Sequence, residues 1–258
     1  MESIEVIFRA TAVTALFAGC AATPNTTNPP PIAEPVAQEP PEVSIHGALR
    51  LIMHQGEWQR RVDLAPMANQ AGLYGLGAIE GLDGEVTIWD GELWVSRPDG
   101  SGGFETTKNS SDDLGATLLV TSTVDGWSDI PIEGSLSWTE IDAFVEAQAS
   151  AAGLDTSHPF PFLLEVSPGR LDWHVIDGSR IPSDSHGHEA HVSTAVRGEL
   201  SNRPVEILGF FSKNHRGVFT HHISDTHLHV VDRAEEVTGH VDHLDIANVG
   251  LLRIPASR

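Results

Sequence analysis

Three histidines near the C-terminal end are the residues of this chain best suited to chemistry. In the segment THLHVVDRAEEVTGH, Thr226 to His240, one residue separates His227 from His229, and His240 follows after a further ten residues. Alternate side chains of a strand share a face, so His227 and His229 should lie roughly 6 to 7 Å apart. The polar residues that end in Gly239 can reverse the chain and bring His240 beside them. The sequence therefore predicts that three imidazoles converge on one metal ion.

The composition of this set favours a catalytic metal over a structural one. Three neutral imidazoles leave a coordination position open, whereas a structural zinc site is normally closed by four protein ligands, often including Cys. The single cysteine, Cys20, lies far away in the sequence. We expect Zn²⁺, although iron, nickel or copper also accept such ligands. Nearby carboxylates could accept hydrogen bonds from the imidazoles: Asp225, Asp232, Asp242 and Asp245.

The prediction of a metal site needs support from a second segment, because 14 histidines in 258 residues make one His-x-His pair unremarkable. The segment GLYGLGAIEGLDGEVTIWDGELWV, Gly72 to Val95, predicts a glycine loop that leads into a β-hairpin with its turn at Asp90-Gly91. Glu85 stands where the hairpin begins. The alternative is that Glu85 is a solvated residue at a sheet edge.

The two segments together resemble the α-acetolactate decarboxylase family. Members carry a GLDGE-type loop followed by a strand and an Asp-Gly turn, and a later His-x-His motif followed by Gly-His. The segment Gly209-Phe210-Phe211, leading into Gly217-Val218, is also similar to the family. The resemblance runs from about Ile45 to Ile246, and two motifs in the right order are more specific than either alone.

The resemblance implies a zinc lyase that converts 2-acetolactate, a small 2-hydroxy-3-keto acid, to acetoin and carbon dioxide. It implies that His227, His229 and His240 hold the metal and that Glu85 is the carboxyl group closest to proton delivery. Loss of carbon dioxide leaves an enediolate, whose charge a metal stabilises as a Lewis acid. A general acid must then protonate that enediolate.

Three departures from the family pattern point to a diverged member. Ala78 replaces a threonine of the glycine loop, and the residues after His240 contain no Glu where the family has one. The family's arginine should fall within FPFLLEVSPGRL, where this chain offers Glu165 and Arg170 as candidate catalytic replacements. The alternative is an exported zinc-binding protein that binds a small ligand or metal without decarboxylation.

The N-terminal segment predicts export. The apolar run at 10 to 19 follows Arg9, ends before Cys20 and is too short to span a bilayer. It resembles a lipoprotein-type signal peptide, residues 1 to 19, which would leave the chain anchored at a bacterial membrane only through a lipidated Cys20. A buried structural cysteine is the alternative. Residues 20 to 42 are rich in Pro and predict an extended, unpaired tether.

Residues 43 to 258 are expected to form one domain, or two packed halves, with enough chain for a sizeable core. The formal charge of −21 disfavours nucleic acid as a partner. It also makes an anionic substrate dependent on a local positive centre, for which a metal ion is suited.

We expect an α+β fold rich in β-sheet, with mixed and antiparallel sheets and few helices. Ser137 and Glu140 form a capping box before a helix that Gly153 would end. A weaker helix pattern covers Arg60 to Gln70 and is broken by Pro66. Apolar runs predict strands: Ala116 to Val120, Phe162 to Val166, Val205 to Phe211 and His227 to Val231.

One further histidine-rich tract, DSHGHEAH, contains His186, His188 and His191. Such a tract can bind transition metals weakly, but more often marks an exposed loop. His221 precedes the predicted ligand strand and shares a face with His227 and His229 by alternation. It is left out of the metal-binding set because it lies too far from them along the chain.

Overall fold

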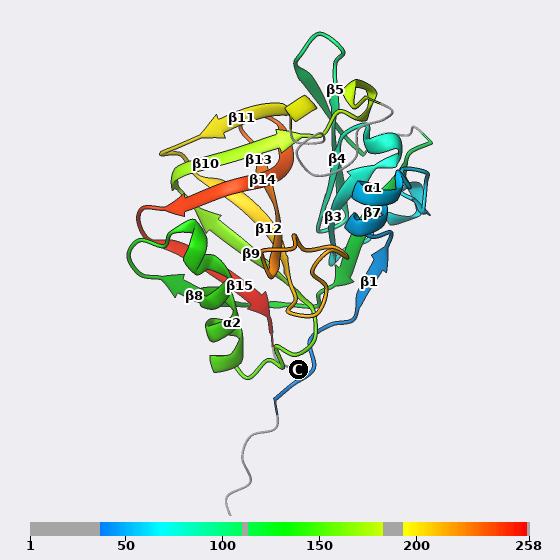
Figure 1. The fold of residues 1–258 in the computed structure, drawn as a ribbon. Coiled ribbons are helices and arrows are strands. Elements are labelled where there is room, and N and C mark those ends of the chain that lie inside the picture. Colours follow the sequence, from blue (N-terminus) through cyan, green and yellow to red (C-terminus); the bar gives the residue numbers. More distant parts are fainter. Residues whose placement is uncertain (1–36, 110–112, 183–192, 257–258) are drawn as a thin grey trace, which may run out of the picture. The chain divides into compact units, whose positions relative to one another are not determined.

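A computed structural model describes residues 37–109, 113–182 and 193–256 (Figure 1). The chain divides into two units, Met1–Glu34 and Pro35–Arg258, and all described residues belong to the second. The signal peptide at 1–19, Cys20, most of the tether and the tract at 184–191 therefore lie outside the described residues. Within the described ranges, no helix has both the length and the apolar character needed to cross a bilayer.

The first sheet takes its strands from the N-terminal half of the unit. Its strand order is β1-β7-β3-β4-β5-β6, with β2 paired to β7. The strands are β1 (Val43–His46), β2 (Val62–Asp63), β3 (Leu73–Ile79), β4 (Glu85–Trp89), β5 (Glu92–Pro98), β6 (Phe104–Lys108) and β7 (Gly115–Thr123).

The second sheet contains the predicted ligand strand. Its strand order is β11-β10-β14-β13-β12-β9-β15-β8. The strands are β8 (Trp127–Ile132), β9 (Phe160–Val166), β10 (Pro168–Val175), β11 (Val196–Leu200), β12 (Val205–Phe211), β13 (Thr226–Asp232), β14 (Val237–Ile246) and β15 (Gly250–Pro255).

The predicted β-rich α+β class is confirmed. The named strands pair antiparallel, and within the described ranges the parallel contacts are isolated bridges, Gln38 with Leu154 and Arg216 with Thr220. Gln38 also receives a hydrogen bond from Asp155 N and donates one to Gly153 O, both at 2.8 Å. The last residues of the predicted tether are therefore attached to the domain rather than unpaired.

The β4–β5 hairpin forms as the sequence predicts. Asp90 and Gly91 have φ angles of 51° and 78°, the left-handed pair that a two-residue hairpin turn requires. A Cβ at Gly91 would lie 2.3 Å from the carbonyl oxygen of Gln70, so close backbone approach adds to the demand for glycine. Glu85 is the first residue of β4, the strand that ends at this turn.

The glycine loop is shorter than the sequence suggests. Residues 73–79 form β3, and the loop is confined to the 3₁₀ turn η2 (Glu80–Leu82) and the two residues after it. Gly77 lies inside β3, where a Cβ would stand 1.9 Å from Leu118 O of the adjacent strand β7. Glycine there serves close strand packing rather than a turn.

Helical structure is limited and partly predicted. The capping box at Ser137 and Glu140 forms in η3 (Trp138–Glu140), which leads into α2 (Ile141–Ala151). Gly153 follows with a φ of 87°. The weak helix over 60–70 is wrong, because that segment contains β2 and the 3₁₀ turn η1 (Ala65–Met67) with Pro66 near its start. The helical elements α1 (Leu49–Gln55) and η4 (Gly178–Arg180) were not anticipated.

The two sheets meet through a shared apolar cluster. Leu76 and Leu118 from the first sheet pack in one buried cluster with Leu208 and Phe210 from the second. Strand β4 also contacts β14 directly. Side chains of β4, such as that of Glu85, can therefore reach the histidines of the second sheet.

Candidate metal centre

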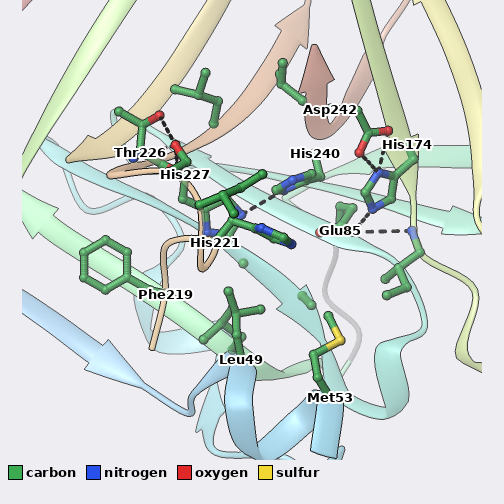
Figure 2. A pocket seen from close by; sticks show the side chains of 18 of the residues that line it. Leu49, Met53, Glu85, His174, Phe219, His221, Thr226, His227, His240 and Asp242 are labelled. Carbon is green, nitrogen blue, oxygen red and sulfur yellow. Dashed lines mark hydrogen bonds and ion pairs between the residues drawn. The ribbon is translucent and has the colours of Figure 1, made fainter. Parts of the chain in front are cut away.

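The structure brings the three predicted histidines together. Strand β13 carries His227 and His229, and the turn after Asp232 returns the chain so that His240 of β14 pairs in register with His229. One ring nitrogen from each histidine lies within 4.8 Å of the others. His227 Nε2 and His240 Nδ1 are 2.9 Å apart. Figure 2 shows the rings of His227 and His240 at one side of a pocket.

The three rings are suited to metal binding because burial keeps them neutral. Removal from water lowers the pKa of His227 to about 3 and lowers the pKa values of His229 and His240 well below the usual range. Each ring then keeps a nitrogen lone pair at neutral pH. Tetrahedral Zn²⁺ with Zn–N bonds of 2.0–2.1 Å needs nitrogens about 3.3 Å apart, which this cluster can supply with small shifts.

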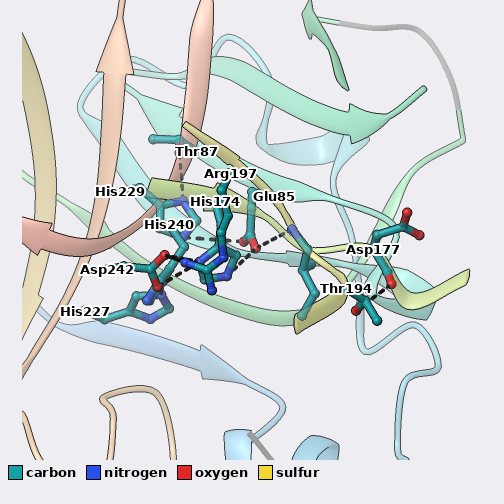
Figure 3. Close-up of polar contacts among 11 residues, drawn as sticks. Glu85, Thr87, His174, Asp177, Thr194, Arg197, His227, His229, His240 and Asp242 are labelled. Atoms are coloured by element: carbon teal, nitrogen blue, oxygen red, sulfur yellow. Dashed lines mark hydrogen bonds and ion pairs between the residues drawn. The ribbon is translucent and has the colours of Figure 1, made fainter. Parts of the chain in front are cut away.

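A chain of hydroxyl groups defines which nitrogen of His229 faces the centre. Thr238 donates its hydroxyl to Val230 O at 3.0 Å, and its oxygen lies 2.6 Å from Thr87 Oγ1. Thr87 therefore donates to Thr238 and accepts from His229 Nδ1, which is 3.0 Å away. The Nδ1–H tautomer of His229 leaves Nε2 with a free lone pair, as a metal ligand requires. Figure 3 shows the contact between Thr87 and His229 as a dashed line.

Glu85 is buried beside these rings, so the alternative of a solvated edge residue is wrong. Its side chain is 5% exposed, and Oε2 lies 3.6 Å from His229 Nε2. Burial raises the pKa of Glu85 well above its usual value, while a hydrogen bond from Ile176 N to Oε1 at 3.3 Å opposes that rise. The carboxyl group thus stands within reach of anything bound at the centre.

His174 of β10 lies beside Glu85 in this group of polar side chains, and the sequence motifs did not predict it. Its Nε2 lies 3.9 Å from Glu85 Oε1, and its Nδ1 lies 2.9 Å from both oxygens of Asp242. Arg197 of β11 in turn donates to Asp242 Oδ2 at 3.0 Å (Figure 3). The signal was present in LDWHVID, Leu171 to Asp177, whose apolar alternation is interrupted by one histidine. Only the pairing of His174 with His240 across β10 and β14 reveals its position.

The structure does not bring Glu165 or Arg170 to the histidines. Glu165 lies on β9, where it pairs with Arg253 Nη1 at 2.6 Å. Arg170 is an exposed residue of β10 that pairs with Asp172. Neither lines the pocket of the three histidines, which removes the basis for their expected catalytic roles.

The predicted carboxylate partners of the imidazoles also bind elsewhere. Asp225 pairs with Arg216, Asp245 with His243, and Asp232 with Arg203. Asp245 and Asp242 do bind imidazoles, but those of His243 and His174 rather than those of the three predicted ligands.

The centre opens into a cavity of about 550 Å³. Glu85, His174, His227 and His240 line it, as do the apolar side chains of α1 and of the segment that precedes β13. Ala78, at the position of the family threonine, is another lining residue, and so is His221, although it lies before the ligand strand.

The three histidines, set beside a buried glutamate in a protein of two antiparallel sheets, form a group that could hold a metal ion. No family model and no curated sequence matches this chain. Its fold, however, is similar to solved α-acetolactate decarboxylases. The enzyme from Bacillus subtilis strain 168 aligns with a TM-score of 0.66 at 14% identity, over 86% of each chain.

Two further structures agree. Acetolactate decarboxylase from Bacillus subtilis subspecies spizizenii aligns with a TM-score of 0.65 at 15% identity, over 86% of this chain and 87% of that one. A Staphylococcus aureus protein of unknown function, described as similar to α-acetolactate decarboxylase, aligns at 0.64 and 16% identity, over 82% and 84%. The resemblance seen in the motifs is therefore confirmed at the level of the fold.

Proposed function

We propose that this protein is a metal-dependent lyase that removes the carboxylate of a 2-hydroxy-3-keto acid of the acetolactate type, releasing carbon dioxide and a hydroxyketone. The observation that carries the proposal is the position of Glu85, whose Oε2 lies 3.6 Å from His229 Nε2. A carboxyl group that close to a three-imidazole centre is placed for proton transfer. The shared fold supports the same reaction class.

His227, His229 and His240 would hold the metal, expected to be Zn²⁺. When bound, a divalent metal supplies Lewis acid stabilisation for negative charge on the substrate oxygens. Glu85 is the general acid in this scheme, and it delivers a proton to the carbon that loses carbon dioxide. In the metal-free protein, burial raises the pKa of Glu85 above its usual value.

His174 orients the reacting end of the substrate. Asp242 accepts from Nδ1, so in the neutral ring Nε2 is an acceptor that faces Glu85 and the cavity. It can accept a hydrogen bond from the substrate hydroxyl or from the Glu85 carboxyl. Arg197 holds Asp242 from the far side and keeps this ring in place.

One observation favours a second candidate, a protein that binds a small ligand at the metal without decarboxylation. Among the described residues that line the cavity, none is Arg or Lys. A substrate carboxylate therefore lacks the guanidinium clamp that usually recognises it, and Glu85, Asp142 and Asp242 lie in the same cavity.

The two candidates are separated by acetoin release from racemic 2-acetolactate. The zinc-loaded protein is compared with the double variant His227→Ala/His229→Ala and with Glu85→Gln. Turnover that both variants lose supports the lyase. One tightly bound zinc per chain without turnover overturns the lyase and supports the binding protein.

A further inference from the structure

The cavity has two chemically different ends. Glu85, His174, His227, His240 and Asp242 form a polar wall, and Figure 2 shows these side chains gathered on one side. Further polar residues of the lining are Thr139, Asp142, His221, Ser224 and Thr226. Leu49 and Met53 of α1 face them from the other side, and Phe219 lies at the left of the view. A ligand whose polar atoms reach the histidines must therefore extend any remaining part into apolar surroundings.

The apolar end is extensive. Besides Leu49, Met53 and Phe219, the apolar residues that line the cavity are Ile52, Leu82, Leu118, Trp138 and Ile223, with Ile176 beside Glu85. Ile223 is 75% exposed. An exposed isoleucine at the edge of a cavity is costly in water unless an apolar partner covers it.

The volume is also larger than the reaction alone demands. About 550 Å³ lies within the range of roughly 300 to 1,000 Å³ that proteins use for drug-sized ligands. Acetolactate carries only methyl groups beside its carboxylate, hydroxyl and ketone, so its polar end would occupy the histidine wall and leave the apolar end filled with water.

From the size of the apolar end and its position opposite the histidines, we infer that the natural substrate carries an extended apolar group. It is a 2-hydroxy-3-keto acid with an alkyl or aryl chain of several carbons, attached at the hydroxyl-bearing carbon or on the keto side. This inference rests on the proposed function for the reacting end and concerns the remainder of the ligand. The chain lies along Leu49, Met53 and Phe219, with Ile223 at the mouth.

The test uses two series of acids in which the methyl group at either position is lengthened to propyl and then hexyl. Each buried methylene should raise kcat/KM for carbon dioxide release about fourfold until the cavity is full. The matching 2,3-dihydroxy acids cannot lose carbon dioxide by this route, and their affinity for the zinc-loaded protein is measured by calorimetry. Affinity should rise with chain length in at least one series.

Turnover tests the proposed lyase, and the dependence of affinity on chain length tests the apolar extension, so each can be contradicted without the other. Affinity that rises with length without turnover overturns the lyase but keeps the apolar ligand class. Turnover of acetolactate with affinity and kcat/KM that stay flat or fall with length, in both series, overturns the apolar extension and keeps the lyase.

A pair of variants on one helix locates the chain. Leu49→Trp fills the apolar end, and we expect it to lower the ratio of hexyl to methyl affinity at least tenfold. Leu51→Trp is the matched control, because Leu51 lies on α1 outside the cavity lining, and it should leave the ratio unchanged. Equal ratios in both variants would contradict the assigned position.

Discussion

Thr87 of β4 and His229 of β13 meet across the two sheets, with Thr87 Oγ1 3.0 Å from His229 Nδ1. This contact joins a residue of the first sheet to a predicted metal ligand of the second. Both side chains are fully buried, so water cannot replace the hydroxyl. The orientation of the ligand therefore depends on how the sheets pack, and the metal centre and the fold are coupled.

Replacing Thr87 with valine tests this coupling. Valine keeps the shape of threonine but leaves His229 Nδ1–H without its hydroxyl acceptor, so we expect the affinity for zinc to fall about 10- to 100-fold. Competition with a chromophoric chelator measures the change. Thr87→Ser keeps the hydroxyl and should retain most of the affinity. Equal affinity in the valine variant would mean that the hydroxyl does not orient the ring.

Each of the three histidines should be required for metal binding. We expect His227→Ala, His229→Ala and His240→Ala to bind less than one zinc per chain after dialysis, measured by elemental analysis, because two imidazoles rarely retain the ion. His158→Ala is the control, since His158 is an exposed residue paired with Asp155. Full zinc content in any of the three variants would remove that histidine from the ligand set.

The metal centre could be predicted from the sequence because its geometry is local. Strand alternation fixes His227 against His229, and one hairpin brings His240 into register with His229. Glu85 was singled out by the GLDGE-type motif and its family resemblance, and the Asp90-Gly91 turn defines only the hairpin that it begins.

The rest of the site depends on strand order, which no local pattern carries. His174 reaches the centre only because β10 lies beside β14, and Thr87 because β4 packs against that sheet. The same limit explains the error at Arg170, which lies on the same strand as His174 but pairs with Asp172 at the surface. Sequence motifs identified the three candidate metal ligands but not the residues that orient them.

The metal-free protein should lose stability in acid. Burial lowers the pKa of His227 to about 3 and also lowers those of His229 and His240. Below pH 6.5 the unfolded chain binds protons that the folded chain does not, so the free energy of unfolding falls as pH falls. Each histidine contributes up to about 1.4 kcal/mol per pH unit in that window.

Urea unfolding of the metal-free protein between pH 7 and pH 4 measures this contribution. His227→Gln cannot take up the proton, so its stability should fall less steeply than that of the wild type. His158→Gln serves as the exposed control and should follow the wild type. Parallel curves for the wild type and His227→Gln would contradict the burial of this ring.

At neutral pH, the buried Glu85 should lower the free energy of unfolding of the metal-free protein, although the proposed reaction requires this residue. Burial raises its folded-state pKa well above 4.5, so its contribution to stability is lost as pH rises from 4.5 through that higher pKa. Glu85→Gln removes the ionisable group, and we expect the variant to unfold at a higher urea concentration than the wild type at pH 7.5. The gain should shrink toward pH 4.5.

In the zinc-loaded protein the same change should lower kcat about 10²- to 10⁴-fold, the usual loss for a general acid. The control is Glu165→Gln, because Glu165 is a half-buried glutamate outside the cavity that pairs with Arg253; this variant should show neither effect. A stability gain independent of pH would mean that Glu85 does not change its charge in this range.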